Sequence, residues 1–495
     1  MIDLTAHLPA LQVVVPLVAA PLCVLFARRA IAWALCFAAS LAALLIAITL
    51  LHQVLAAGPI SYALGGWAPP WGIEYRVDAL NAYILLIIAA ISTVVLLFGA
   101  GSVPREIPPR RQTLFYACYA LCLTGLLGIT ITGDAFNVFV FLEISSLSTY
   151  ALISMGTRRK ALTAAFQYLV MGTIGATFIL IGIGLLYMMT GTLNMADLAQ
   201  RLHLADPSRP VLTAFAFITV GLALKAALFP LHLWLPNAYA FAPTVVTVFL
   251  AATATKVSVY VMIRILYTVF GGAPVFGDLM IDDALMGLGM LSMLAAGLVA
   301  VFQTNVKRLL AYSSVSQIGY MILGLSLGSV AGLAAGIIHI FNHAMMKAAL
   351  FMAMGCAFSR AGVVSVDDLA GLGRRMPVTM AVIVIGSLSL IGVPLTVGFV
   401  TKWYLIRAAL ELGFWPVAVV VLMSGLLAVV YTWRIVEAAY FTPAPPEREE
   451  VHEAPLPMLV PLVCLGAACI VFGIYSTPPM DVALAAARSL IGTAP

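Results

Sequence analysis

Long apolar runs separated by short polar breaks make up most of the chain. A hydrocarbon core about 30 Å thick needs a helix of roughly 20 apolar residues, and the sequence supplies fourteen runs of this kind. They lie near residues 10–27, 31–55, 79–101, 112–132, 135–156, 162–190, 211–235, 243–270, 284–304, 309–329, 331–358, 378–410, 416–441 and 457–475. The pattern predicts an all-α polytopic membrane protein with about 14 transmembrane helices.

The composition agrees with a chain that lies mostly in lipid. Hydrophobic residues make up 63% of the 495 residues and charged residues 9%, far from the composition of soluble domains. Two polar stretches, near 56–78 and 443–456, are too short to fold as separate domains or to hold a nucleotide. Gly172, Gly182 and Gly184 in the sixth predicted span are expected to allow close helix packing. Any chemistry is therefore expected inside the bundle.

Basic residues of the loops fall mainly on one side of the predicted bundle. Fourteen lie on that side, and four lie on the other: Arg76, Arg201, Arg209 and Arg488. By the positive-inside rule the richer side is cytoplasmic, and an even number of spans then places both termini outside. The net charge of +5 is explained by this excess, so it gives no reason to expect a nucleic-acid partner.

Several charged residues are predicted inside the spans, where each costs on the order of 2.5–3.5 kcal/mol near the bilayer centre. Glu143, Lys225, Lys256 and Lys402 have no oppositely charged residue three or four positions away. Their partners must therefore come from other helices. These four residues predict an ion pathway through the membrane, and static ion pairs between helices are the alternative.

Four other charged residues in the spans have simpler explanations. Arg264 and Arg407 lie near helix ends, from which a long side chain can extend to the lipid headgroups. Arg434 and Glu437 are three residues apart on one helix and can pair with each other, or take part in transport. We expect the first two to be membrane anchors.

Helix-breaking residues interrupt the seventh and twelfth predicted spans. Pro230 follows Lys225 by five residues, and Pro394 and Gly398 precede Lys402. A broken helix leaves backbone groups that water can satisfy at membrane depth, and paired breaks of this kind mark the binding sites of secondary transporters. A simple kink in a packed helix is the alternative at either position alone.

Weak internal similarity relates two parts of the bundle. Ser145–Ser146 in the fifth span corresponds to Ser313–Ser314 in the tenth, an offset of 168, and Lys225 and Lys402 are 177 apart. We infer two five-helix repeats, spans 4–8 and 9–13, with opposite orientations because five is odd. The predicted divisions are 1–111 (three N-terminal helices), 112–270 (first repeat), 284–441 (second, inverted repeat) and 442–495 (an acidic loop, helix 14 and tail).

Between the broken spans, His339, His343 and Lys347 recur every four residues and so share one face of a helix. Histidine titrates near neutral pH, so this face can pass protons along a water chain. No carboxylate or cysteine nearby completes a metal site, and no cofactor is expected. His232 lies beside the break in the seventh span. It is predicted to be an orienting or relay residue, and a packing histidine is the alternative.

Five segments of the chain carry a resemblance to a known family. They are GDAFNVFVFLEISSLSTYALISMG, LALKAALFPLHLWLPNAYAFAPT, ATATKVSVYVMIRI, KRLLAYSSVSQIGYMILG and HIFNHAMMKAALFMAMG. In this order they resemble the proton-translocating subunits shared by respiratory complex I, membrane-bound hydrogenases and Mrp-type sodium/proton antiporters, over roughly residues 75–440. The fourteen spans, the GDAFN opening and the short C-terminus look most like the D-type branch of the Mrp antiporter subunits.

The resemblance implies a proton relay through the residues that match the family's motifs. In order along the relay they are Glu143, which would pair with Lys225, then Lys256, then the central face of His339, His343 and Lys347, and last Lys402 of the second half-channel. The family's WLPDAH pattern is WLPNAY here, so Asn237 and Tyr239 stand where an acid and a histidine are common. This departure weakens the case for a titratable route at the cytoplasmic end of the seventh span.

The resemblance also implies partners and a location. The chain would be one membrane subunit of a multisubunit complex in the plasma membrane of a prokaryote, and it would move protons, with sodium as an alternative coupled ion. The complex would be a cation/proton antiporter or, alternatively, a complex I type NADH:quinone oxidoreductase or a membrane-bound hydrogenase. No redox chemistry is expected of the chain itself.

Three other functions compete with a proton relay. A carrier for a sugar or amino acid would share the broken helices but would not need a file of lysines and histidines. A redox enzyme is disfavoured because the seven cysteines form no CxxC pattern and no flavin fold is predicted. A non-transporting scaffold within a larger complex is the third alternative.

Overall fold

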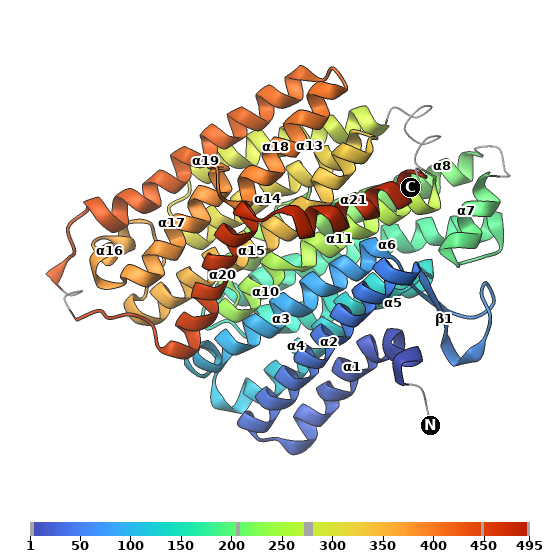
Figure 1. Ribbon diagram of the computed structural model, residues 1–495. Helices are drawn as coiled ribbons and strands as arrows, with labels where there is room; N and C mark the ends of the chain where they lie inside the picture. The colour runs from blue at the N-terminus through green and yellow to red at the C-terminus, as the bar shows by residue number, and fades with distance from the viewer. Residues whose placement is uncertain (1–3, 204–207, 272–280, 447–449, 493–495) are drawn as a thin grey trace.

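The computed structural model describes residues 4–203, 208–271, 281–446 and 450–492. These residues form a bundle of helices that lie side by side (Figure 1). In the described part of the chain, thirteen helices are long and apolar enough to cross a membrane, and counting one bent pair as a span gives fourteen. The prediction of an all-α polytopic membrane protein is confirmed, with the small addition of a hairpin of β1 (Ile60–Ala63) and β2 (Glu74–Val77).

The helix bounds follow the predicted runs closely. The first part of the chain forms α1 (Leu8–Phe26), α2 (Arg29–Ala57), α3 (Ala79–Glu106), α4 (Gln112–Ile131), α5 (Ala135–Ser154), α6 (Lys160–Thr190), α8 (Arg209–Ala226), α9 (Trp234–Phe241), α10 (Thr244–Ala252), α11 (Ala254–Ile263) and the π-helical η4 (Arg264–Val269). The second part forms α13 (Ile281–Val301), α14 (Val306–Ser326), α15 (Val330–Ala361), α17 (Pro377–Ile391), α18 (Val397–Glu411), α19 (Trp415–Phe441), α20 (Leu456–Ile474) and α21 (Thr477–Ile491). Short helices outside the spans are η1 (Leu4–His7), η2 (Leu64–Gly66), η3 (Pro109–Arg111), α7 (Met195–His203), η5 (Asp367–Leu369) and α16 (Leu372–Arg375).

The two ends of the bundle differ in chemistry. One end, here called the hairpin face, carries the β1–β2 hairpin, α7 and both chain termini (Figure 1). The His7 imidazole lies 2.9 Å from the Tyr62 hydroxyl of the hairpin, which fixes the start of α1 at this end. The opposite end, here called the basic face, carries α16 (Figure 1) and the Arg105 and Arg360 side chains, which contact Ser359 and the His452 carbonyl.

The breaks predicted in the seventh and twelfth spans are confirmed. In the seventh, α8 ends at Ala226, the next residue Ala227 has a left-handed φ of 58°, and α9 begins at Trp234. The Trp234 indole donates a 3.0 Å hydrogen bond to the Leu224 carbonyl, which also accepts one from the Ala227 amide at 3.1 Å. In the twelfth, α17 and α18 are separated by a turn in which Gly392 and Leu395 have positive φ values.

The eighth span is also broken, and no residue predicts this break. Thr253 has φ −126° and ψ −58°, outside the helical region, so the span divides into α10 and α11. The Thr253 hydroxyl donates to the Phe249 carbonyl at 2.7 Å. Because proline and glycine are absent from this stretch, the usual signals of a helix break are missing.

The two predicted repeats run in opposite directions through the bundle. α4 begins at the basic face, directly after Arg110 and Arg111 in η3. α13 instead ends there, because the residues that follow it pair with those that follow Arg360 of the basic face: Asn305 bridges to Ser365, and the Val306 amide donates to the Val364 carbonyl. The fourth span of each half is the one with the predicted break, as an inverted repeat requires.

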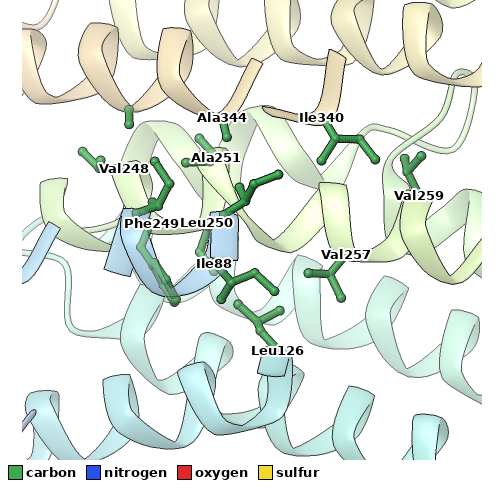
Figure 2. Packing of buried hydrophobic residues seen from close by; sticks show 14 of the residues in the cluster. Ile88, Leu126, Val248, Phe249, Leu250, Ala251, Val257, Val259, Ile340 and Ala344 are labelled. Atoms are coloured by element: carbon green, nitrogen blue, oxygen red, sulfur yellow. The ribbon is translucent and has the colours of Figure 1, made fainter. Parts of the chain in front are cut away.

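The core of the bundle is built around α15 and the broken eighth span. Figure 2 shows Ile88 of α3, Leu126 of α4, Phe249 of α10, Val257 of α11 and Ile340 of α15 meeting in one apolar cluster. α15 packs against α3, α10, α14, α17, α18, α20 and α21. The predicted relay residues of α15 therefore lie at the centre of the bundle.

The predicted C-terminal tail is a further helix, α21. It packs against α15 and α3 and ends at the hairpin face (Figure 1). At the end of α20, Gly473 lies so close to the break in the twelfth span that an added Cβ would sit 2.4 Å from the Leu395 carbonyl oxygen. α20 thus covers the outside of that break.

Candidate ion pathway

Glu143 and Lys225 face each other across α5 and α8. The Lys225 ammonium lies 3.5 Å from Glu143 Oε1 and donates a 2.8 Å hydrogen bond to Ser146 Oγ. The Lys225 side chain is 3% exposed, whereas that of Glu143 is 27% exposed. The structure therefore brings the two residues together as an ion pair, with the acid partly at the surface of the bundle.

A small polar cavity lies beside the Lys225 side chain. Its lining includes Ser145, Ser146, Thr149 and Ser258, and it has room for about one water molecule. Serine and threonine hydroxyls both donate and accept hydrogen bonds. The first lysine of the predicted relay thus lies in a polar pocket within the apolar bundle.

Lys256 lies on α11 just after the break at Thr253. Its ammonium donates to the Ala251 carbonyl and, at 3.4 Å, to Thr255 Oγ1. Lys256 is 1% exposed, and no carboxylate of the described ranges lies within ion-pair distance of it. The break therefore matters for this lysine, because it frees a carbonyl that can hold the ammonium.

His339, His343 and Lys347 lie on one face of α15, as their spacing predicts. The two imidazole rings stack with centroids 5.6 Å apart, and the Lys347 ammonium donates to the Leu310 carbonyl at 2.9 Å and to Ser313 Oγ at 2.5 Å. Among the described residues, both ring nitrogens of His343 and Nε2 of His339 have no hydrogen-bond partner. These nitrogens are available to a water or a proton.

Lys402 is held at the break of the twelfth span. Its ammonium donates to the carbonyls of Leu390 (3.1 Å) and Ile391 (2.5 Å) at the end of α17, and it lies over the Tyr320 ring, 5.4 Å from the centroid. Unlike Lys225, it has no carboxylate partner in the described part of the chain. Lys402 follows its break whereas Lys225 precedes one, so their offset does not mark equivalent positions of the repeat.

Two residues that are not among the predicted set connect α15 to this break. Asn342 Nδ2 donates to the Val397 carbonyl and to Thr401 Oγ1, both at 2.9 Å. Thr401 Oγ1 also lies 3.1 Å from Nδ1 of His339. Asn342 stands three residues after His339 on the same helix, and that spacing is the signal that could have pointed to it.

The seventh-span residues that depart from the family pattern lie in different surroundings. Asn237 donates to Gln167 Oε1 at 2.8 Å. Tyr239 is buried, and its hydroxyl donates to the Leu250 carbonyl at 3.2 Å, one residue from the carbonyl that holds Lys256. His232 stacks on Phe229, and its Nδ1 has no partner among the described residues.

A second cavity opens on the basic face beneath the α9–α10 connection. Glu106, Arg158 and Lys307 are among the residues that line it. The Glu106 carboxylate accepts hydrogen bonds from the Thr244 amide (2.8 Å) and Ser102 Oγ (2.7 Å). A carboxylate that the sequence did not single out thus lies where the seventh and eighth spans meet this face.

The charged residues with simpler explanations divide into two groups. The prediction for Arg264 is wrong: its side chain is 8% exposed and forms an ion pair with Asp78, at the start of α3, and does not extend to the headgroups. Arg407 is 65% exposed and pairs with Glu411. Arg434 donates to the Val301 and Gln303 carbonyls, and no ion pair joins it to Glu437 in the described part of the chain.

These features define an all-α membrane protein with a file of carboxylate, lysine and histidine side chains buried between broken helices. The chain belongs to the family described as NADH:quinone oxidoreductase/Mrp antiporter transmembrane proteins, whose model matches residues 132–428.

Individual relatives come from both branches of this family. The chain is 42% identical over 489 residues to NADH-quinone oxidoreductase subunit N of Desulforudis audaxviator, covering 96% of this chain and 97% of that protein. It is 29% identical over 486 residues to the D subunit of the Na(+)/H(+) antiporter of Alkalihalophilus pseudofirmus, covering 98% and 97%.

Two solved structures share the whole fold. A chain of the Mrp complex from Dietzia sp. DQ12-45-1b superposes with a TM-score of 0.90 at 26% identity, covering 99% of this chain and 98% of that one. A chain of the membrane-bound sulfane sulfur reductase, an archaeal respiratory membrane complex, superposes with a TM-score of 0.89 at 34% identity, covering 98% of both. Both structures are of multisubunit membrane complexes, so other membrane subunits are the partners of this chain.

Proposed function

We propose that this chain translocates protons across the plasma membrane as one subunit of a multisubunit cation/proton antiporter. The observation that carries the proposal is the Glu143–Lys225 contact at 3.5 Å, buried in the bundle and joined to a polar cavity. Charged groups inside a membrane bundle mark ion pathways. Sodium is the alternative coupled ion.

The relay would work by switching the charge of Lys225. Burial disfavours the charged form of a lysine, and a nearby carboxylate favours it. When Glu143 approaches, Lys225 holds a proton, and when Glu143 withdraws, Lys225 releases it toward Lys256. The cavity that Glu106 lines gives this half an opening on the basic face.

The central face would carry the proton between the two halves. His343 offers two unpartnered ring nitrogens in the described structure, and His339 is joined through Thr401 to the helix that carries Lys402. Lys347 and Lys402 are both held by carbonyl oxygens, which accept hydrogen bonds without taking the proton. His232, at the break of the seventh span, is proposed as an orienting residue of the first half.

Orientation and repeat boundaries belong to the same proposal. The basic face would be cytoplasmic, since the basic loop residues gather there, and both termini on the hairpin face would lie outside. The relay would divide between a first repeat at 112–270 and a second at 284–441, flanked by 1–111 and 442–495.

A second candidate function is the proton-pumping subunit of a complex I type NADH:quinone oxidoreductase or a related respiratory complex. The 42% identity to a subunit N over nearly the whole chain favours it. The two candidates share the relay and differ in the driving partner. Purification of the tagged chain from its own host under mild detergent would separate them, because redox subunits with flavin or iron–sulfur centres accompany only the second.

Replacement of Lys225 by alanine tests the relay. In membrane vesicles that contain the whole complex, Lys225→Ala should abolish proton-coupled transport while the subunit stays assembled, because Lys225 is the cation that pairs with Glu143 in the described structure. Arg407→Ala is the matched control, since it removes an exposed cation whose ion pair is with Glu411 on the same helix. Full transport by assembled Lys225→Ala would rule the proposal out.

Two further outcomes distinguish the other classes of function. Uptake of a labelled sugar or amino acid by vesicles that contain the chain would favour a solute carrier. Normal growth and transport after Lys402→Ala would favour a scaffold without a transport role.

A further inference from the structure

We propose that Arg264, fixed by Asp78 and Tyr260, forms an electrostatic seal that closes the proton relay toward the hairpin face. The proposal rests on the proposed function, because it assumes that Lys256 carries protons. It gives a role to Arg264, Asp78 and Tyr260, which take no part in the proposed relay steps. Without such a seal, a lysine reached from one face could also exchange protons with the other.

A large polar cavity opens near this point on the hairpin face. It has a volume of about 380 Å³, and Arg76, Asp78, Gln200 and Arg264 are among the residues that line it. Ser489 of α21 contributes to its rim, so the C-terminal helix forms part of the wall. A cavity of this size and polarity holds water, which brings solvent to the Arg264–Asp78 pair.

The residues between this cavity and the relay lie on one helix face. Lys256, Tyr260 and Arg264 recur every four residues along α11 and the first residue of η4, so they lie above one another. Tyr260 and Arg264 line the cavity, whereas Lys256 does not. The path from the water to Lys256 along this face therefore passes the guanidinium and the phenol ring.

The seal is tightly constructed. Arg264 Nε donates to the Tyr260 hydroxyl at 3.1 Å, and the guanidinium lies 5.4 Å from the centre of the Tyr260 ring. The Tyr260 hydroxyl in turn donates to the Thr130 carbonyl at 2.8 Å. A second arginine nitrogen donates to Asp78. Three helices, α3, α4 and α11, are thus tied together at this point.

Charge explains why this arrangement would stop protons. Arginine stays protonated at any physiological pH, so it can neither accept a proton nor pass one on. A fixed guanidinium in a narrow polar passage also repels an incoming cation, a device that excludes protons and cations from channels. Asp78 also lines the cavity, and its ion pair with Arg264 holds the arginine in place.

The first experiment measures passive proton leak. In everted vesicles that contain the complete complex, with no driving reaction, an imposed pH gradient decays slowly in the unmodified protein. The double variant Asp78→Asn/Arg264→Gln keeps a hydrogen-bonding pair without a buried unpaired charge. Its leak should rise several-fold, because a fixed guanidinium no longer lies between the cavity and Lys256.

Matched variants show whether the leak uses the relay. Arg264→Lys keeps a positive charge but in a group that can release its proton, so it should also raise the leak. Arg407→Gln removes an exposed arginine and should leave the leak unchanged. Adding Lys256→Ala to the leaky double variant should return the leak to its original rate. An assembled double variant with no added leak, or a leak that Lys256→Ala does not suppress, would overturn the seal.

A second variant keeps the test valid if the double variant fails to assemble. Tyr260→Phe removes a single hydroxyl, which frees Arg264 Nε and should raise the leak several-fold, and an unchanged leak would contradict the proposal.

The passive leak and active transport are separate measurements, so the two proposals can fail independently. Normal transport by Lys225→Ala would refute the proposed function, whereas an unchanged leak in the double variant would refute only the seal.

Discussion

Single residues of this protein owe their positions to partners that are distant in sequence. Lys225 has no local counter-charge, and its partner Glu143 lies on another helix, as that pattern indicates. For Lys256 the same expectation is wrong, because Ala251 and Thr255 of its own span hold the ammonium. The sequence cannot name every partner. Arg264 meets Asp78 across 186 positions, so the pair is invisible in the local sequence, which predicts a lipid anchor instead. The contact becomes apparent only when α3 and α11 are placed side by side.

The Asp78–Arg264 pair has a predictable pH dependence. Burial raises the pKa of Asp78, but the adjacent Arg264 guanidinium and the Asn81 amide more than offset this, so the pKa lies below its usual value. A carboxyl with a depressed folded-state pKa contributes stability above the unfolded value of about 4, and loses it as the pH falls through the folded value.

Asp78→Asn should therefore destabilise the protein most at neutral pH. The expected loss is about 3–5 kcal/mol, because Arg264 is left as a buried unpaired charge. The shift in thermal unfolding temperature, measured in detergent at a series of pH values, should shrink below about pH 4. A shift of constant size across this range would contradict the assignment.

At the scale of elements, proline and glycine predict two breaks and miss a third. The seventh and twelfth spans contain prolines, which cannot continue a helix. The eighth breaks at Thr253, where threonine hydroxyls compete with the backbone for hydrogen bonds, and the surrounding packing decides the outcome. The sequence pattern misses the hairpin and α21 for a related reason, since both are short and acquire order from the helices they cover.

Helix contacts can be tested with two glycines of one helix. An added Cβ at Gly182 would lie 2.4 Å from Ile218 Cγ1 and 2.8 Å from the Ala214 carbonyl of α8, whereas at Gly184 it would meet nothing within 4 Å. The expectation that Gly184 allows close packing is therefore wrong, and that for Gly182 is confirmed.

Gly182→Ala should destabilise the α6–α8 contact by about 1–3 kcal/mol, the usual cost of overpacking. Gly184→Ala is the control and should be neutral or slightly stabilising, because alanine favours a helix more than glycine does. Thermal unfolding of the two variants in the same detergent provides the comparison. Equal effects at both positions would show that α6 and α8 do not pack as described.

At the scale of the whole molecule, hydropathy alone predicts the number and approximate limits of the spans. This success has a simple cause: a lipid-exposed backbone must satisfy its hydrogen bonds within each helix, so the membrane permits few other folds. Which helices contact one another is not coded in hydropathy. The central position of α15 and the cover that α21 provides emerge only from the structure.

The orientation of the bundle gives a whole-molecule prediction. Trp71 lies at the hairpin and is 92% exposed, and Arg110 is an exposed residue of the basic face. In right-side-out vesicles a membrane-impermeant maleimide should label Trp71→Cys and not Arg110→Cys. Everted vesicles should give the reverse pattern, with the unmodified protein as the background for its native cysteines. Labelling in the opposite sense would invert the proposed topology.

The unequal surroundings of the two break lysines bear on how the subunit must be driven. Lys225 faces a carboxylate, whereas Lys402 is held by backbone carbonyls and an aromatic ring. A positive charge is better compensated at the first position than at the second. In an isolated subunit the proton would therefore stay on Lys225 in the first half, where the positive charge has the lower free energy. In the proposed relay, moving that charge forward would require work from outside, so the neighbouring subunits of the complex would set the direction of flow.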